Sequence, residues 1–121
     1  MKKILFAAFT VLFAVPVWAE LTVYTDRSKD RYVNAAKAFE AQTGEKIVFV
    51  EGATKDLLSN LETEGKQTPA DLIIAKDLIF LNELSIKKLL QPMVKSAAVN
   101  TVDESMRDSN LNWVALTYRA R

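Results

Sequence analysis

The residues Thr25 to Ser28, a cluster of hydroxyl and charged side chains, are the best candidates for binding chemistry in this sequence. They follow a short β-prone run, Leu21–Thr25, and precede a helical pattern that begins at Asp30. An arginine and hydroxyl groups beside a helix N-terminus can bind an anion, because the backbone N–H groups there are unpaired and the helix dipole is positive. The alternative is structural: Asp26 and Ser28 form a turn and cap the helix.

The composition excludes several other kinds of site. The chain contains neither cysteine nor histidine, which excludes disulfides, thiolate chemistry, histidine-based triads and histidine–metal clusters. It has no phosphate-binding glycine loop, no dinucleotide-binding motif and no nucleophile elbow. Glu62 and Glu64 are interpreted as a solvated helix end and not as an acid–base pair. The residues therefore give no support for an enzyme.

The first 19 residues have the layout of a secretory signal peptide. Lys2 and Lys3 give a positive start, an apolar run extends from Ile4 to Val15, and Val17 and Ala19 place small residues before a cleavage point. The apolar run is shorter than the ~20 residues that a membrane span needs. We therefore expect cleavage after Ala19, export, and no stable insertion in the membrane.

The remainder, residues 20–121, has little net charge. Removing residues 1–19 takes away two of the 16 basic side chains and none of the 15 acidic ones. This balance argues against a nucleic-acid or membrane-surface partner. The length suffices for one hydrophobic core.

Strand-like and helix-like segments alternate along residues 20–121. The expected strands are Leu21–Thr25, Lys46–Val50, Asp71–Ala75 and Trp113–Thr117, and the expected helices are Asp30–Gln42, Lys55–Glu64 and Leu78–Lys88. Gly44 and Gly65 should end the first two helices, and Thr54 should cap the start of the second. Residues 95–106 are expected to be a loop with one helical turn. This alternation predicts an α/β fold with a mostly parallel sheet flanked by helices.

Apolar spacing predicts which side chains form the core. The helix residues expected to pack on the sheet are Leu57, Leu58, Leu61, Leu78, Leu81 and Leu84. Tyr24 and Tyr118 are expected to pack in the core or in strands, and Tyr32 to lie on a helix surface.

The loops that follow the strands should form one surface. Ligands bind beyond the carboxyl ends of the strands in parallel sheets of this kind. The loops Thr25–Ser28, Gly52–Lys55 and Ala75–Asp77 should therefore converge on one rim of the sheet. This expectation favours a binding role for Thr25–Ser28 over the alternative of an ordinary turn.

Several motifs together resemble the periplasmic ferric-iron-binding proteins, which are solute-binding components of ABC importers. The motifs are VYTDRS (23–28), FEAQTG (39–44), EG (64–65), TPADL (68–72), LLQP (89–92), RDSN (107–110) and WVALTYRAR (113–121). The resemblance implies a two-lobed α/β fold of which residues 20–121 are an incomplete first lobe, an N-terminal fragment without the second lobe. It also implies a periplasmic location, an ABC permease as partner, a monomer and no enzymatic activity.

The resemblance implies a site for Fe³⁺ with a carbonate-like anion, in which the main iron ligands are tyrosines of the absent second lobe. Arg27 and Arg119 correspond to arginines that hold the anion, and a guanidinium fork suits a planar anion. Thr25 and Ser28 are candidates for additional donors. We therefore expect this chain to bind Fe³⁺ poorly or not at all by itself.

The direct metal ligands of many family members are missing here. Ser28 and Lys29 occupy positions where many members have histidine, or histidine followed by tyrosine. Lys76 stands where some members have a glutamate ligand, and Asp77 is the nearest substitute. Two alternatives stay open: a binding protein for another anionic or polyamine-type solute, and a small exported domain that is complete at 121 residues.

Overall fold

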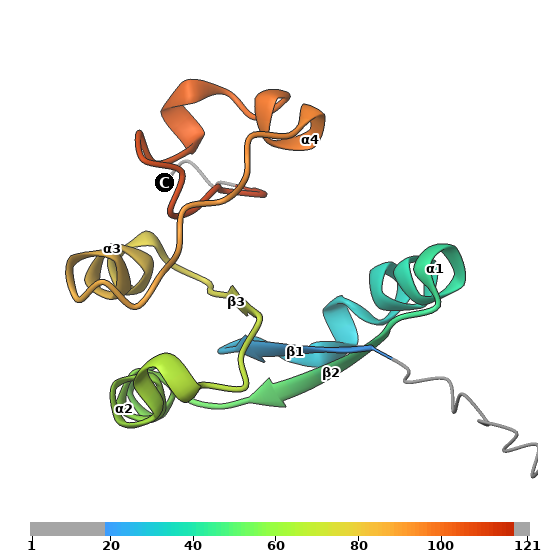
Figure 1. The fold of residues 1–121 in the computed structure, drawn as a ribbon, viewed down its shortest axis with the longest axis horizontal. Coiled ribbons are helices and arrows are strands. Elements are labelled where there is room, and N and C mark those ends of the chain that lie inside the picture. The colour runs from blue at the N-terminus through green and yellow to red at the C-terminus, as the bar shows by residue number, and fades with distance from the viewer. Residues whose placement is uncertain (1–18, 118–121) are drawn as a thin grey trace, which may run out of the picture.

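The computed structural model describes residues 19–117 and contains a three-stranded parallel sheet of order β2-β1-β3. The strands are β1 (Glu20–Thr25), β2 (Lys46–Glu51) and β3 (Leu72–Ile74). Helices α1 (Val33–Thr43), α2 (Thr54–Glu64) and α3 (Leu78–Ile86) alternate with them, as Figure 1 shows. The predicted α/β class and parallel sheet are confirmed. The predictions for residues 1–18, Tyr118 and Arg119 lie outside the described residues.

Helices cover both faces of the sheet. Side chains alternate between the faces of a strand, so Val23 and Tyr24 point in opposite directions. Tyr24 belongs to the main core with Leu57, Leu61, Phe80 and Leu84, which come from α2 and α3. The other face carries Val23 and its register partner Phe49, whose ring stacks on Tyr32 at the start of α1, with the centroids 6.0 Å apart. In Figure 1, α1 and α2 accordingly lie on opposite sides of β1 and β2.

Most predicted core positions are confirmed, with one correction. Leu57, Leu61 and Leu84 are at most 2% exposed, and Leu58 and Leu81 pack against them. Leu78, however, is 45% exposed, whereas Phe80 is only 2% exposed. The reason is that α3 begins at Leu78, so its first turn faces outward and the inner face starts at Phe80.

The predicted helix ends are partly confirmed. Gly44 follows α1 with a φ of 76°, a left-handed conformation that glycine adopts without strain, and Gly65 follows α2. The predicted cap Thr54 is wrong. The N-cap of α2 is Ala53, and Thr54 is the first helical residue. The Thr54 hydroxyl instead donates a hydrogen bond across the sheet edge to Asp26.

The predicted fourth strand at residues 113–117 is also wrong. Val114 forms only an isolated antiparallel bridge with Arg107. The Asp108 N–H donates to the Trp113 carbonyl at 3.0 Å, and the Ala115 N–H donates to the Met106 carbonyl at 2.7 Å. The segment is extended but pairs with its own preceding turn, so it adds no strand to the sheet in the described part of the chain (orange to red in Figure 1).

The chain before this turn contains the expected helical turn and a second short one. They are α4 (Ala97–Asn100) and a 3₁₀ turn at Glu104–Met106. Across residues 19–117, no helix has both the length and the apolar character needed to cross a membrane.

Candidate functional site

The three loops beyond the carboxyl ends of the strands meet around Asp26. Its Oδ2 accepts a hydrogen bond from the Thr54 hydroxyl at 2.9 Å, and its Oδ1 accepts one from the Lys76 N–H at 2.9 Å. Thr54 is the first residue of α2, directly after the loop that follows β2, and Lys76 lies in the loop after β3, so one carboxylate joins the ends of all three strands. The predicted convergence is confirmed. We call the three loops, Thr25–Ser28, Gly52–Lys55 and Ala75–Asp77, the rim.

Two hydrogen bonds join the chain after β1 to the end of β2. The Gly52 N–H donates to the Thr25 carbonyl at 3.1 Å, and the Lys29 N–H donates to Glu51 Oε1 at 2.8 Å. A Cβ atom on Gly52 would lie 3.0 Å from the Leu57 side chain, so only glycine fits here without displacing a core residue.

Thr25 is a buried residue that orients the first loop of the rim. Its side chain is fully buried, and its Oγ1 accepts a hydrogen bond from the Arg27 N–H at 3.1 Å. Thr25 therefore fixes the backbone of the neighbouring arginine, and in this structure its hydroxyl does not reach solvent.

Three rim residues carry a positive charge, and of these Lys55 and Lys76 are exposed whereas Arg27 is not. It is half-buried, and its Nη2 makes a long hydrogen bond of 3.5 Å to the Lys76 carbonyl. It forms no ion pair with a carboxylate of residues 19–117. A half-buried guanidinium with its charge uncompensated in this way can donate two parallel hydrogen bonds to a planar anion.

Ser28 and Asp77 both cap helical turns. The Ser28 hydroxyl accepts from the Asp30 N–H at 3.4 Å at the start of a 3₁₀ turn, Lys29–Arg31. Asp77 Oδ1 accepts from the Phe80 N–H at 3.0 Å at the start of α3. The structural alternative considered for Ser28 is thus realised, and both side chains remain on the exposed surface of the rim.

An open groove of about 1550 Å³ extends from Arg27 and Lys76 along β3 to the segment 103–117. Its walls are largely apolar and include Leu72, Leu89 and Trp113. Within residues 19–117, no group of three acidic side chains could hold a metal ion. The described part of the site therefore offers an anion contact beside an apolar groove.

One partly buried polar cluster was not predicted. The Tyr24 hydroxyl donates to Glu64 Oε1 at 2.9 Å, and the Thr68 hydroxyl donates to Glu64 Oε2 at 2.7 Å. Burial, reinforced by the hydrogen bond to Glu64 and its charge, raises the pKa of Tyr24. The prediction that Tyr24 packs in the core is confirmed. Glu64 is the last residue of α2, as its interpretation as a helix end requires, but its carboxylate is partly buried and hydrogen-bonded and not simply solvated.

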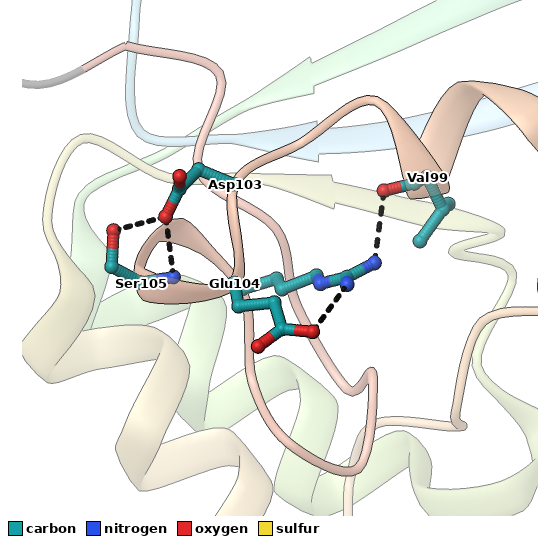
Figure 2. Close-up of polar contacts among 5 residues, drawn as sticks. Val99, Asp103, Glu104 and Ser105 are labelled. Carbon is teal, nitrogen blue, oxygen red and sulfur yellow. Dashed lines mark hydrogen bonds and ion pairs between the residues drawn. The ribbon is translucent and has the colours of Figure 1, made fainter.

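The charged side chains of segment 97–107 form hydrogen bonds and an ion pair within that segment. The Ser105 N–H and hydroxyl donate to Asp103 Oδ1 at 2.8 and 2.6 Å, as Figure 2 shows. These hydrogen bonds lower the pKa of the Asp103 carboxyl. Arg107 donates to the Val99 carbonyl at 3.3 Å and lies 3.6 Å from Glu104 Oε1. Arg107 is therefore a structural residue, in contrast to Arg27.

Comparison with known proteins agrees with this architecture. The chain is 31% identical over 119 residues to the major ferric iron-binding protein of Neisseria gonorrhoeae, covering 98% of this chain and 36% of that protein. It is 29% identical over 102 residues to iron uptake protein A1 of Synechocystis, covering 84% of this chain and 28% of that protein. The solved structure of the Trichodesmium protein IdiA (FutA) with iron and citrate superposes with a TM-score of 0.74 at 25% identity, over 79% of this chain and 30% of that one.

The chain thus spans about a third of the length of the curated relatives it matches. Residues 21–117, nearly all of the described part, match the family of bacterial extracellular solute-binding proteins. The parallel sheet, the rim at the strand ends and these matches agree, and the chain belongs to the bacterial extracellular solute-binding protein family.

Proposed function

We propose that the protein containing this chain is the periplasmic ferric-iron-binding component of an ABC importer, and that this chain supplies the anion-holding side of the site. The observation that carries the proposal is the position of Arg27, half-buried where three strand ends meet and without a carboxylate partner in residues 19–117. The names of the relatives, a ferric iron-binding protein and an iron uptake protein, support the choice of Fe³⁺ as cargo.

The chemistry of the site follows from the charges. Hard Fe³⁺ prefers anionic oxygen donors, by analogy with other hard cations. An anion that bridges the metal and the rim supplies such oxygens, and Arg27 stabilises its charge through paired N–H donors. The iron-binding phenolates are proposed to come from a second lobe. An ABC permease then accepts the closed, loaded protein, which acts as a carrier and not as an enzyme.

The proposal is tested by iron retention in the full-length protein. Arg27→Ala should release Fe³⁺ to a competing chelator on the order of 10- to 100-fold more readily when bicarbonate or citrate is present, since charge-assisted hydrogen bonds contribute about 1.5–3 kcal/mol. Arg27→Lys keeps the charge but loses the fork, so it should fall between the wild type and the alanine variant.

Lys37→Ala is the matched charge control. Lys37 is exposed on α1 and does not line the groove, so its loss changes the net charge without touching the rim. Equal iron release from Arg27→Ala and Lys37→Ala, or release that does not depend on the anion, would reject the role of Arg27.

A further inference from the structure

The carboxylate of Asp26 makes both of its hydrogen bonds within the rim. Both of its oxygens accept hydrogen bonds, from the Thr54 hydroxyl and from the Lys76 N–H, and both donors are neutral groups. Within residues 19–117 no lysine or arginine pairs with this carboxylate. Its hydrogen-bonding capacity is therefore directed at the two neighbouring loops and not at a cation.

The sheet alone does not hold the loop that contains Lys76. The pairing of β1 with β3 ends at Thr25 and Ile74, so Lys76 lies two residues beyond the last paired position. Beyond the last paired residues of the two strands, the hydrogen bond from the Lys76 N–H to Asp26 connects this loop to the chain after β1.

The same lysine residue contacts Arg27. The Lys76 carbonyl accepts the hydrogen bond from Arg27 Nη2, while Thr25 Oγ1 accepts from the Arg27 backbone N–H. The backbone of Arg27 is thus held by Thr25 of β1, and its guanidinium contacts a loop that hydrogen-bonds to Asp26.

We propose that Asp26 is a positioning residue that sets the anion-binding geometry of Arg27 through Lys76. This inference rests on the proposed function for its ligand, but its structural part stands on the contacts among residues 25, 26, 27 and 76. Asp26 does not touch the anion or the metal. It fixes the peptide that the guanidinium contacts, and it joins the β2 side of the rim to the same point through Thr54.

Two substitutions of Asp26 separate its geometry from its charge. Asp26→Ala removes both hydrogen bonds. Asp26→Asn retains the shape, because the amide oxygen can accept from the Lys76 N–H while the amide nitrogen donates to the Thr54 oxygen. We expect the alanine variant to lose the positioning of Arg27 and the asparagine variant to keep it.

The first measurement is independent of iron. NMR of the full-length protein should show that Asp26→Ala accelerates hydrogen exchange of the Lys76 amide at least tenfold and shifts the Arg27 Nε resonance. Asp26→Asn should leave both close to the wild type. Tyr24→Phe, which removes a hydrogen bond elsewhere in the same lobe, is the control for a general loss of stability. Unchanged Lys76 exchange and Arg27 resonance in Asp26→Ala would overturn the inference.

The second measurement is a double-mutant cycle for anion-dependent iron retention. If Asp26 acts through Arg27, Asp26→Ala should weaken retention by about tenfold, and the double variant should be no weaker than Arg27→Ala alone. Effects that multiply would mean that the two residues act separately, and they would overturn the inference.

The two proposals fail in distinguishable ways. If the wild-type full-length protein retains no Fe³⁺ with any anion, the proposed function is wrong, and the NMR measurement still decides whether Asp26 positions Arg27. If the wild type retains Fe³⁺ but the cycle is additive, the function stands and the positioning role is rejected.

Discussion

The partly buried cluster of Tyr24, Glu64 and Thr68 gives a quantitative test of the fold. Tyr24→Phe removes one hydroxyl from a side chain that is 4% exposed and leaves its ring in the core. A hydrogen bond to a charged group contributes about 1.5–3 kcal/mol, and Glu64 keeps its second donor, Thr68. We therefore expect the free energy of unfolding to fall by about 1–2 kcal/mol.

Urea unfolding of the protein, followed by circular dichroism, measures this change. With a slope of about 2 kcal/mol per molar urea, the midpoint should fall by roughly 0.5–1 M. Tyr32→Phe is the matched control, because the Tyr32 ring stacks on Phe49 and its hydroxyl makes no hydrogen bond to the described residues. Equal losses of stability in both variants would refute the assigned role of the Tyr24 hydroxyl.

The same cluster has a defined pH dependence. Because the pKa of Tyr24 is raised above its ordinary value of 10.0, the folded state holds the phenolic proton more tightly than the unfolded state. The associated stability is fully present below about pH 10 and is lost as the pH rises through the raised pKa. The wild type should therefore lose more stability than Tyr24→Phe over this alkaline range, and parallel profiles would contradict the explanation.

Three further outcomes are expected. Leu84→Ala should lower the free energy of unfolding by about 2–5 kcal/mol, because Leu84 is 0% exposed. Leu78→Ala, at a position that is 45% exposed, should lower it by less than about 1.5 kcal/mol. Similar urea midpoints for the two variants would contradict the assigned core. The 121-residue chain alone, titrated with Fe³⁺ and bicarbonate, should show no phenolate–iron absorption band, and a red complex would contradict the proposed division of the site. Mass spectrometry of the exported protein should give Glu20 as its first residue, and retention of residues 1–19 would reject cleavage after Ala19.

The local pattern was sufficient to predict the three strands of the sheet and the approximate place of the site. The β-prone run ending at Thr25, the glycine after α1 and the leucine spacing of α2 all act over short distances, so they are readable from the sequence. The rule that strand ends converge then placed the rim correctly.

The roles of Asp26 and Glu64 were not predictable in the same way. The partners of Asp26 lie 28 and 50 residues away, and Tyr24 lies 40 residues from Glu64. The local sequence around Asp26 predicts only a turn, and the local sequence around Glu64 predicts only a polar helix end. Their hydrogen bonds exist because the folded sheet brings separate loops together, which no local pattern records.

The prediction of a strand at residues 113–117 was wrong for a related reason. Its β-propensity is satisfied by the preceding turn, through Asp108 and Met106, so an extended segment forms without adding a strand to the sheet. Propensity predicted the backbone conformation of this segment, but it could not identify the pairing partner.

The strand order β2-β1-β3 also leads us to expect an order of folding events. The strand that comes first in the chain lies in the middle, so it can pair with β2 after a short connection closes, while β3 must wait for a longer one. The β1–β2 pairing spans six residues on each strand and the β1–β3 pairing only three. The β1–β2 hydrogen bonds can therefore survive when β3 separates, so we expect local opening to begin on the β3 side, beside the groove. Because Asp26 hydrogen-bonds to the loop that follows β3, the residue that shapes the rim also restrains the part of the sheet that we expect to open first.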